Sequence, residues 1–294
     1  MDEHAKLSVC IATFNEEHTI GRCLKSVYDW CDEIIIVDGN STDATKSLAQ
    51  SFGDKVKITN VPNEQMFHKM KQKALELATG EWILQLDADE AITEELKVEI
   101  VNLLNGQIAR NNSNNLAIEQ LPIAFWIPRV NYLLGRGLKK GGQYPDYTIR
   151  LYKNGVARFP CESVHEQVKI INHKVNPSLP SPDRGGKTSN LDVEVGYMQN
   201  PMNHYPYPTF SAYLDKWDRY CALEAKLLSE QNIKPTLFMG VSYFLFKPIY
   251  WFLLAYIRHR GYVDGFSGFV FALFSALRYP LIYINLYEQT CVSL

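Results

Sequence analysis

Residues 7–104 alternate short, β-branched apolar runs with helical stripes, and this alternation constrains the fold more than any other feature of the chain. The runs predicted to be strands are 7–12, 34–37, 56–59 and 82–86. Strands that alternate with helices form a mainly parallel sheet covered on both faces, and such sheets bind ligands beyond the carboxyl ends of their strands. The predicted fold class is therefore α/β.

The segments between these runs have the patterns of amphipathic helices. One apolar stripe recurs at i, i+3, i+4 and i+7, and it consists of Ile20, Cys23, Leu24 and Val27. After the second strand, Ser41 or Thr42 is expected to cap a helix that Gly53 ends. Residues 66–78 form a third helical pattern before the strand at 82–86.

The pattern changes beyond residue 104. Residues 105–120 are polar and aperiodic, which predicts a surface insertion. Residues 125–167 return to strand-like runs that could extend the sheet as a mixed or antiparallel part. Residues 173–190 are rich in Pro, Gly and Ser and are predicted to be a loop, and a long helix is predicted from Thr209.

The last sixty residues are rich in apolar and aromatic side chains. The stretches 236–246 and 249–257 are separated by Lys247 and Pro248, and a further apolar stretch covers 266–284. A transmembrane helix needs about 20 uninterrupted apolar residues, so neither region is expected to be a clean span. Interrupted, aromatic-rich helices flanked by Lys and Arg favour peripheral or monotopic membrane attachment. Burial in a helical subdomain, a dimer interface and true spanning remain alternatives.

Composition narrows the class of protein. The chain has 294 residues and a net charge of -2, so it has no overall basic field and nucleic acid is not an expected partner. Its six cysteines have no metal-finger spacing and are interpreted as small buried residues in a reducing compartment. The first residues lack the pattern of a signal peptide, and the catalytic part is therefore placed in the cytoplasm.

Polar residues follow three of the predicted strands. Residues 13–17 come after the first strand, Asp38 after the second, and Asp87 and Asp89 after the fourth. Asp38 can accept a hydrogen bond from a pyrimidine or a hydroxyl, and two carboxylates one residue apart can address one divalent cation. This edge could thus hold a nucleotide sugar. Solvated turns and helix caps are the plainer interpretation of each motif taken alone.

The segments 8–17, 36–43 and 86–90 together resemble glycosyltransferase family 2 in sequence, order and spacing. The resemblance implies a GT-A fold, with a Rossmann-like, mostly parallel sheet flanked by helices. It also implies a nucleoside-diphosphate sugar donor, a UDP-sugar by preference, and an inverting transfer.

The expected domains follow from this resemblance and from the apolar tail. Residues 1–200 form the GT-A catalytic domain, with a nucleotide-sugar half at about 1–104 and an acceptor half at about 121–200. Residues 201–294 form a helical, membrane-associating C-terminal region.

The resemblance also implies roles for individual residues. The nucleoside pocket is expected to contain Thr13, Phe14, Asn15, Glu16 and Asp38. Asp87 would contact the ribose or the metal, and Asp89 would coordinate Mg²⁺ or Mn²⁺. Lys71 occupies the place of a basic donor contact, although the surrounding sequence departs from the family pattern. A lysine on a solvated helix face is the alternative for Lys71.

The acceptor hydroxyl must lose a proton, so a carboxylate is needed on the other side of the sugar. Residues 160–168 offer Glu162 and Glu166, and this segment resembles the lipopolysaccharide-core branch of the family. Glu166 is the predicted general base, with His165 as an orienting group or further metal ligand. Pairing of both with neighbouring loops is the alternative. Arg150 is expected either to bind phosphate or to hold a carboxylate in the core.

The tail also resembles lipopolysaccharide-core β-1,4-glucosyltransferases, notably over 261–266. The predicted function is metal-dependent, inverting transfer of a hexose, with glucose from UDP-glucose preferred. The acceptor is a lipid-linked saccharide of envelope glycan or lipopolysaccharide core, at the cytoplasmic face of the inner membrane. The alternatives are a polyprenyl-phosphate sugar synthase and a non-catalytic membrane adaptor. Homo-oligomerisation is left open.

Overall fold

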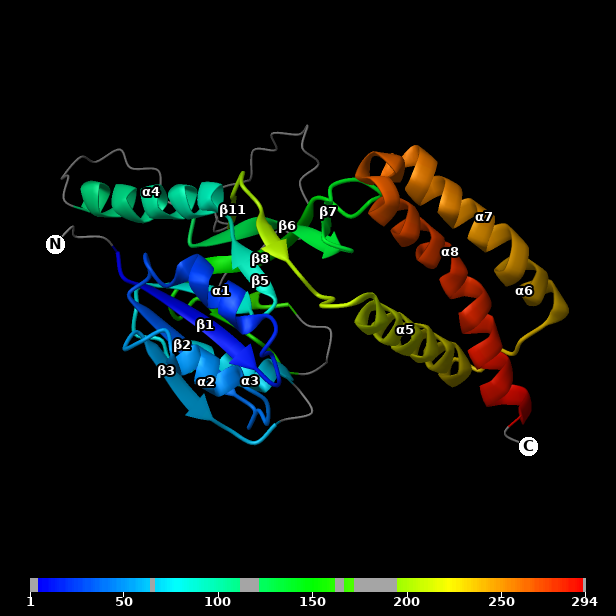
Figure 1. Ribbon diagram of the computed structural model, residues 1–294, viewed down its shortest axis with the longest axis horizontal. Coiled ribbons are helices and arrows are strands. Elements are labelled where there is room, and N and C mark those ends of the chain that lie inside the picture. The colour runs from blue at the N-terminus through cyan, green and yellow to red at the C-terminus, as the bar shows by residue number, and fades with distance from the viewer. Residues whose placement is uncertain (1–4, 64–66, 112–121, 162–166, 172–194, 293–294) are drawn as a thin grey trace. The chain divides into compact units, whose positions relative to one another are not determined.

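Four parallel strands form one part of the sheet (Figure 1). The computed structural model describes residues 5–63, 67–111, 122–161, 167–171 and 195–292. The strands are β1 (Leu7–Thr13), β2 (Glu33–Asp38), β3 (Val56–Asn60) and β4 (Trp82–Asp87). They pair in the order β3-β2-β1-β4, all parallel. All four predicted strands are thereby confirmed to within about a residue at each end.

Alternating side chains of the parallel strands supply two apolar clusters, one on each face of the sheet. Leu7, Val9 and Ile11 belong to the first cluster, while Cys10 and Ala12 belong to the second. The helices α1 (Ile20–Val27), α2 (Thr45–Gln50) and α4 (Glu94–Asn111) contribute to the first cluster, and α3 (Phe67–Leu77) contributes to the second. A strand buried on both faces reads as a continuous apolar run, which is why the runs in the sequence located these strands.

The remaining strands make the sheet mixed. β8 (Asp146–Lys153) pairs antiparallel with β4, and the order continues through β6 (Ala124–Leu133), β12 (Met202–His204) and β5 (Glu90–Ile92). β7 (Arg136–Leu138) and β11 (Val195–Tyr197) both pair with β6, while β9 (Ala157–Arg158) and β10 (Lys169–Ile170) form a small separate sheet. The predicted α/β class, with a parallel sheet flanked by helices and an antiparallel extension, is confirmed.

Two local predictions were wrong. Helix α2 begins at Thr45 with Ala44 at the N-cap, so neither Ser41 nor Thr42 caps it. The Ser41 hydroxyl instead donates to Asp38 at 2.5 Å. Helix α4 continues through Asn111, so the first part of the predicted irregular insertion is helical. Residues 112–121 lie outside the described residues.

Contacts within the chain divide it into two units, which are treated separately below. The first unit is Met1–Arg129 with Tyr147–Asn203, and the second is Val130–Asp146 with His204–Leu294. The segment Val130–Asp146 thus groups with the C-terminal helices.

The second unit contains the predicted long helix. Helix α5 (Phe210–Glu230) begins at Thr209, whose hydroxyl oxygen accepts from the Ala212 amide at 3.1 Å. Most of its apolar stripe is packed, since Phe210 and Leu214 join one cluster and Trp217 and Cys221 another. The helix prediction from Thr209 is confirmed.

A helical hairpin, residues Leu237–Thr290, completes the second unit (Figure 1). Its first arm joins α6 (Leu237–Val241), a π-helical turn, α7 (Lys247–Phe252) and a second π-helical turn that ends at Arg258. A short 3₁₀ turn (Gly261–Asp264) leads into the second arm, which begins with α8 (Gly265–Tyr287).

The Lys247-Pro248 interruption does not break the first arm. The Lys247 amide donates to the Ser242 carbonyl five residues earlier, so a π-helical turn directly precedes the proline. Two helical stretches, Leu237–Arg258 with 22 residues and Gly261–Thr290 with 30, are long and apolar enough to cross a membrane by length and composition. The Lys247-Pro248 interruption seen in the sequence therefore lies within one continuous helical arm.

Candidate active site

The carboxyl ends of β1, β2 and β4 meet at one edge of the first unit. Thr13 lies opposite Asp38 in the β1–β2 register, and Ala12 lies opposite Asp87 in the β1–β4 register. The polar residues that follow these strands are therefore brought together, as their positions in the sequence predicted.

Asp38 is fully buried and organises this edge. Its carboxylate accepts from the Thr13 hydroxyl at 2.9 Å, and from the amide and hydroxyl of Ser41 at 2.8 and 2.5 Å. The Gly39 amide also donates to the Thr13 carbonyl at 2.9 Å. A carboxylate has about four acceptor positions. Asp38 therefore fixes the start of its loop and keeps acceptor capacity for a ligand.

The loops after β1 and β2 are bonded to each other. The Asn15 amide donates to the Ser41 hydroxyl, and the Asn15 side-chain oxygen accepts from the Thr42 amide, both at 2.9 Å. Asn15 and Asn40 have φ values of 56° and 62°, a left-handed conformation that asparagine tolerates better than most residues. The hydrogen bonds of Asn15 to Ser41 and Thr42 hold the two loops in one arrangement.

Two further predicted pocket residues lie in the first of these loops. The Glu16 carboxylate accepts from the Thr19 hydroxyl at 2.6 Å, and the Glu16 amide donates to the Thr45 hydroxyl at 2.7 Å. The Phe14 side chain is exposed and can offer its ring to a flat ligand. Glu16 thus anchors the loop, and the Phe14 side chain points into solvent.

Asp87 lies between two cations. Its Oδ1 atom is 2.5 Å from Lys71 Nζ and its Oδ2 atom is 2.7 Å from Arg150 Nη2. The Gln85 side-chain amide also donates to Oδ1 at 3.2 Å. Both carboxylate oxygens of Asp87 are therefore paired with cationic side chains.

Glu90 lies beneath this group and is completely buried. Its Oε1 atom accepts from Arg150 at 2.8 Å and from Arg129 at 3.1 Å, and its Oε2 atom accepts from the Asp87 amide at 3.0 Å. Burial alone would lower the pKa of Arg150, but Asp87 and Glu90 raise it above its ordinary value, so the guanidinium stays charged. Arg150 thus holds carboxylates in the core, one of its two predicted roles.

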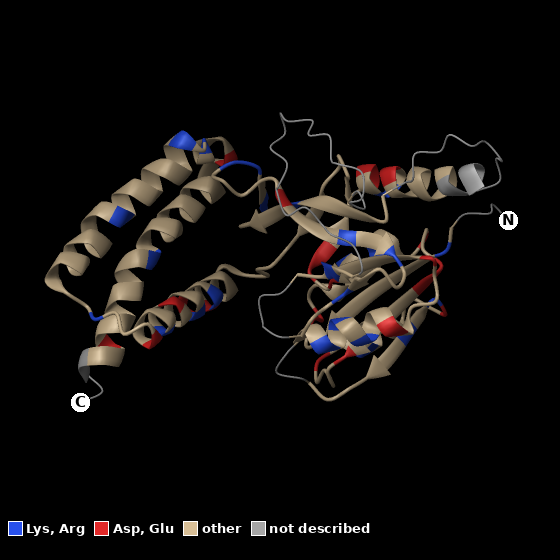
Figure 2. Cartoon of the chain, turned by 180° about the vertical axis from the view of Figure 1, so that it is seen from behind, with Lys and Arg blue, Asp and Glu red and all other residues tan. Residues whose placement is uncertain are grey.

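The three lysines of α3 differ in their surroundings. Lys69 and Lys73 are exposed, whereas Lys71 is buried, with its Nζ 5.5 Å from the centre of the Phe67 ring and 5.8 Å from that of Phe159. Figure 2 marks the Lys and Arg positions in blue along the ribbon of the first unit. The interpretation of Lys71 as a lysine on a solvated helix face was wrong.

The acidic turn fits a divalent cation that is shared with a diphosphate. Asp89 lies in the turn between β4 and β5 and is half-buried. Among the residues that the structure describes, no group of three His, Cys, Asp or Glu side chains could hold a metal ion by itself. Mg²⁺ is usually held by one or two carboxylates, with the remaining positions filled by substrate phosphates and water. Asp89 can supply such a carboxylate.

The predicted base and its neighbour are not among these residues. Glu162, His165 and Glu166 lie outside the described part of the chain. Their roles stay predictions from the sequence.

Three residues at this edge were not anticipated, namely Gln85, Glu90 and Arg129. Gln85 is a polar residue inside an apolar strand, and Glu90 directly follows the acidic pair. A buried polar group needs a hydrogen-bond partner, so Gln85 in an apolar strand was a usable signal of a polar site nearby. Arg129 was not detectable, because its partner Glu90 is 39 residues away.

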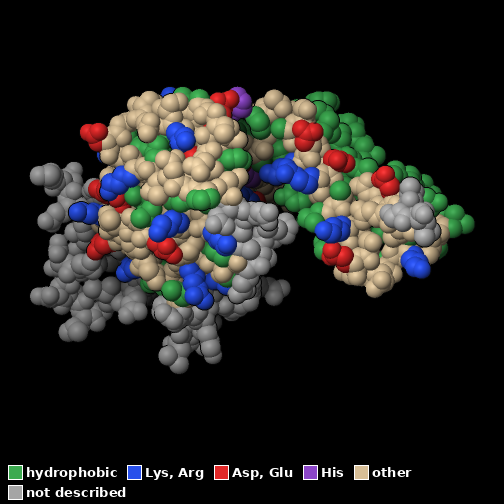
Figure 3. All heavy atoms as spheres, turned by 90° about the horizontal axis from the view of Figure 1, so that it is seen from below, with side chains coloured by type: hydrophobic (Ala, Val, Ile, Leu, Met, Phe, Trp, Pro, Cys, Tyr) green, Lys and Arg blue, Asp and Glu red, His purple; other side chains and the backbone are tan. Residues whose placement is uncertain are grey.

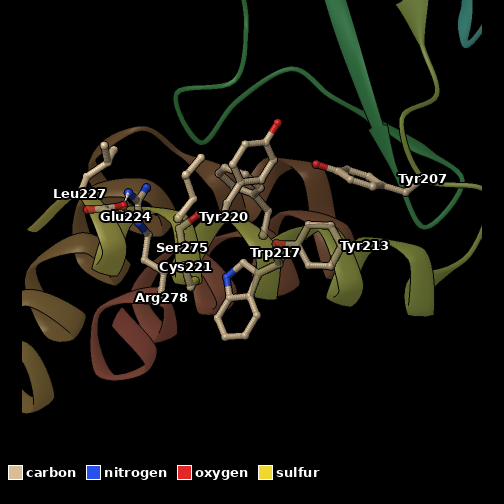
Figure 4. Close-up of a pocket in the computed structure, with 11 residues that line it drawn as sticks. Tyr207, Tyr213, Trp217, Tyr220, Cys221, Glu224, Leu227, Ser275 and Arg278 are labelled. Atoms are coloured by element: carbon tan, nitrogen blue, oxygen red, sulfur yellow. Dashed lines mark hydrogen bonds and ion pairs between the residues drawn. The ribbon is translucent and has the colours of Figure 1, made fainter. Parts of the chain in front are cut away.

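The second unit has a pocket of about 550 Å³ between α5 and α8 (Figure 4). Tyr207, Tyr213, Trp217 and Tyr220 supply aromatic surfaces, and the Trp217 indole is fixed by donating to the Phe274 carbonyl at 2.9 Å. An ion pair between Glu224 and Arg278 lies at the end of the pocket away from Tyr207. Arg278 of α8 therefore faces α5.

Comparisons with known proteins agree with the motifs. Residues 8–109 match the model of the family described as Glycosyl transferase family 2. An uncharacterised glycosyltransferase of Rickettsia typhi is 29% identical over 271 residues, which cover 90% of this chain and 81% of that protein. The lipopolysaccharide core biosynthesis glycosyltransferase LpsC of Rhizobium meliloti is 25% identical over 287 residues, 96% of this chain and 92% of that protein. Among solved structures, S. aureus TarS in complex with UDP covers 98% of this chain and 91% of its own, at 14% identity and a TM-score of 0.46.

Proposed function

The chain carries a glycosyltransferase family 2 domain at residues 8–109 and is a transferase, and on this premise we propose that it transfers a hexose from a nucleoside-diphosphate sugar, with inversion, to a lipid-linked saccharide. The observation that carries the proposal is the shared edge at which Asp38 and Asp87 are the last residues of β2 and β4, on either side of β1. UDP-glucose is the proposed donor.

The base and ribose lie against the two loops that Asn15 joins. Asp38 has acceptor capacity left for a pyrimidine N–H or a ribose hydroxyl. The exposed ring of Phe14 stacks on the base, while Thr13, Asn15 and Glu16 keep this part of the pocket in place.

The diphosphate lies at the acidic turn. Asp89 would hold Mg²⁺ or Mn²⁺ together with the phosphates, and Asp87, already paired with Lys71 and Arg150, would face the ribose. A cation bound there would stabilise the negative charge that develops on the leaving diphosphate. Lys71 adds a second positive charge on the same side.

In the transfer step, the acceptor hydroxyl oxygen forms a bond to the anomeric carbon. The bond from that carbon to the diphosphate oxygen breaks, and its electron pair stays on the diphosphate. Glu166 takes the hydroxyl proton, and His165 orients Glu166 or adds a metal contact. Attack from the face opposite the leaving group gives inversion.

The proposed acceptor belongs to envelope glycan or lipopolysaccharide-core synthesis at the cytoplasmic face of the inner membrane. The relative LpsC is a lipopolysaccharide core biosynthesis glycosyltransferase, and this likeness and the two apolar helices of the second unit support the assignment. A polyprenyl-phosphate sugar synthase would use the same donor site but transfer the sugar to a lipid phosphate.

A donor screen tests the proposal. Thermal unfolding of the full chain is followed with UDP-glucose, other UDP-hexoses and GDP-mannose, each with and without MnCl₂. UDP-glucose is expected to raise the Tm most, and only with the metal, since a ligand that binds the native state stabilises it. Transfer is then assayed on a lipid-linked saccharide and on a polyprenyl phosphate. If no nucleotide sugar raises the Tm, the donor site is wrong, and transfer to the phosphate alone would establish the synthase instead.

A further inference from the structure

We propose that the hairpin Leu237–Thr290 lies in the plane of one membrane leaflet and does not cross the bilayer. The inference extends the membrane contact named under the proposed function, but its evidence is independent of the donor chemistry. The face that enters the lipid, called the outer face below, consists of exposed apolar residues of the first arm: Leu237, Phe238, Val241, Leu245, Phe246, Ile249, Leu253 and Ile257.

The turn of the hairpin is tied to the segment Val130–Asp146 of the same unit. The Gly141 amide donates to the His259 carbonyl at 2.9 Å, and the Lys140 amide donates to the Asp264 carboxylate at 2.7 Å. Arg136 donates to the Val263 carbonyl at 3.2 Å. A spanning hairpin must carry its turn across about 30 Å of hydrocarbon, where unpaired backbone and charged groups are costly. Spanning would break these bonds or pull Arg136 and Lys140 into the bilayer.

The second arm is equally tied along its length to α5. Trp217 donates to the Phe274 carbonyl, Glu224 pairs with Arg278, and Cys221 packs in one cluster with Ile282. Helix α5 has seven charged residues, Asp215, Lys216, Asp218, Arg219, Glu224, Lys226 and Glu230. If the end of the hairpin opposite its turn crossed the bilayer, helix α5 and its charged residues would have to enter the bilayer as well. Both ends of the hairpin are therefore held at the water side.

The outer face is unusually apolar for a surface in water. Leu237 and Phe238 are 87% and 84% exposed, and Phe246 is 63% exposed. Only 6% of the most apolar 18-residue stretch of the first arm is buried. Figure 3 shows hydrophobic side chains gathered along one edge of the helical unit. Exposed apolar patches of this kind mark membrane or protein contacts.

The cations near the middle of each arm are turned away from the outer face. Lys247 Nζ lies 3.6 Å from the centre of the Tyr243 ring and 5.1 Å from that of Tyr279. Arg278 is paired with Glu224 at the pocket beside α5 (Figure 4). The hairpin is therefore amphipathic, as helices in the membrane interface are. In a spanning arm, Lys247 would lie near the bilayer centre, where an ammonium group is costly to bury.

The chemistry of the surrounding residues favours lipid over a second copy of the chain. Tyr250, Trp251 and Tyr262 offer the amphipathic rings that gather at membrane–water interfaces. Arg258 and Arg260 stand beside the apolar arm, where they can contact anionic headgroups. The proposed partner is thus the surface of a bilayer that contains anionic lipid.

Flotation of the full chain with phosphatidylethanolamine–phosphatidylglycerol vesicles tests the contact. The double variant F238D/F246D should reduce the vesicle-bound fraction at least tenfold. The control is Val98→Asp, which also adds a charge at an exposed apolar residue, 56% exposed, but on α4. Thermal shift with UDP-glucose is measured in parallel, so a failed donor prediction cannot be confused with a failed membrane prediction. Unchanged flotation of F238D/F246D would overturn the proposal, as would a chain that dimerises through this face and does not float.

Cysteine labelling tests the orientation. K234C lies before the first arm and R260C lies in the turn, and both positions are exposed. In vesicles that carry the protein on their outer surface, an impermeant maleimide should label both variants equally, and unsubstituted protein gives the background. Among the cysteines whose burial the structure describes, Cys10, Cys23, Cys31 and Cys221 are buried and Cys161 is half-buried, so the background is subtracted from the labelling of each variant. Labelling of one position only after the vesicles are opened would establish a spanning hairpin and overturn the proposal.

Discussion

Arg150 and Asp87 form an ion pair at 2.7 Å that joins β8 to the end of β4. The same Arg150 nitrogen lies 2.8 Å from Glu90. The pair connects the antiparallel strand of the sheet with the acidic turn proposed to hold the diphosphate. The arrangement of the turn therefore depends on a charge 63 residues away in the sequence.

Arg150→Met should destabilise the first unit strongly. It leaves Asp87 and Glu90 with one cation fewer in a buried site, and breaking a buried ion pair in this way costs about 3–5 kcal/mol. Urea unfolding measures the loss. Arg158→Met, at an exposed arginine of β9, is the control and should change stability by less than about 0.5 kcal/mol. Equal stability of the two variants would contradict the buried network.

The two aspartates of the turn should respond differently to removal of their charge. Asp89→Asn is expected to lower metal-dependent transfer at least about 100-fold, because the proposed role of Asp89 is in binding the cation. Asp87→Asn should lower both activity and Tm, because Lys71 and Arg150 lose their shared partner. Transfer assays with a Mn²⁺ titration, together with thermal unfolding, distinguish them. Full activity of Asp89→Asn would remove it as the metal ligand.

Glu33 should make stability fall in acid. Burial raises the pKa of its carboxyl, but hydrogen bonds from Lys57, Ser8 and Thr79 outweigh this and lower the pKa to about 2, from 4.5. Because folding lowers the pKa, the contribution is present above about pH 4.5 and is lost as the pH falls toward about 2. The full contribution is about 3 kcal/mol.

The measurement for Glu33 is urea unfolding between pH 2.5 and 7. Glu33→Gln should be less stable than the unsubstituted protein at pH 7, and the difference should shrink as the pH falls. A difference that does not change with pH would show that the carboxylate contributes nothing through its charge.

Gly268→Ala should open the turn of the hairpin. A Cβ atom at Gly268 would lie 2.0 Å from the Gly261 carbonyl oxygen, a backbone atom that cannot move aside. Hydrogen exchange should increase over Gly261–Asp264, and the Tm should fall. Gly21→Ala in α1 is the matched control, since nothing lies within 4 Å of its Cβ, and helix propensity favours alanine there by up to about 1 kcal/mol. A Tm for Gly268→Ala equal to that of the control would refute this close contact.

Local sequence patterns predicted the helices and strands. They did not predict the contacts between residues far apart in the sequence. The stripe Ile20, Cys23, Leu24 and Val27 located α1 because all four residues are buried on one face. Ser41 was assigned the wrong partner because Asp38 competes for its hydroxyl. The alignment of Asp38 with Asp87 was predictable from the parallel sheet. The partners Glu90 and Arg129 were not, since no local pattern indicates which charges meet across 39 residues.

The grouping of Val130–Asp146 with the C-terminal helices determines how the first unit can be expressed by itself. Leu133 and Leu138 are buried in one cluster with Tyr213 and Val270, and Asn131 lies 2.6 Å from the His204 ring. A stop codon after residue 203 would remove these partners and expose Leu133 and Leu138 to solvent. Expressing the first unit alone therefore requires an internal excision, with a short linker in place of residues 130–146, as well as the early stop.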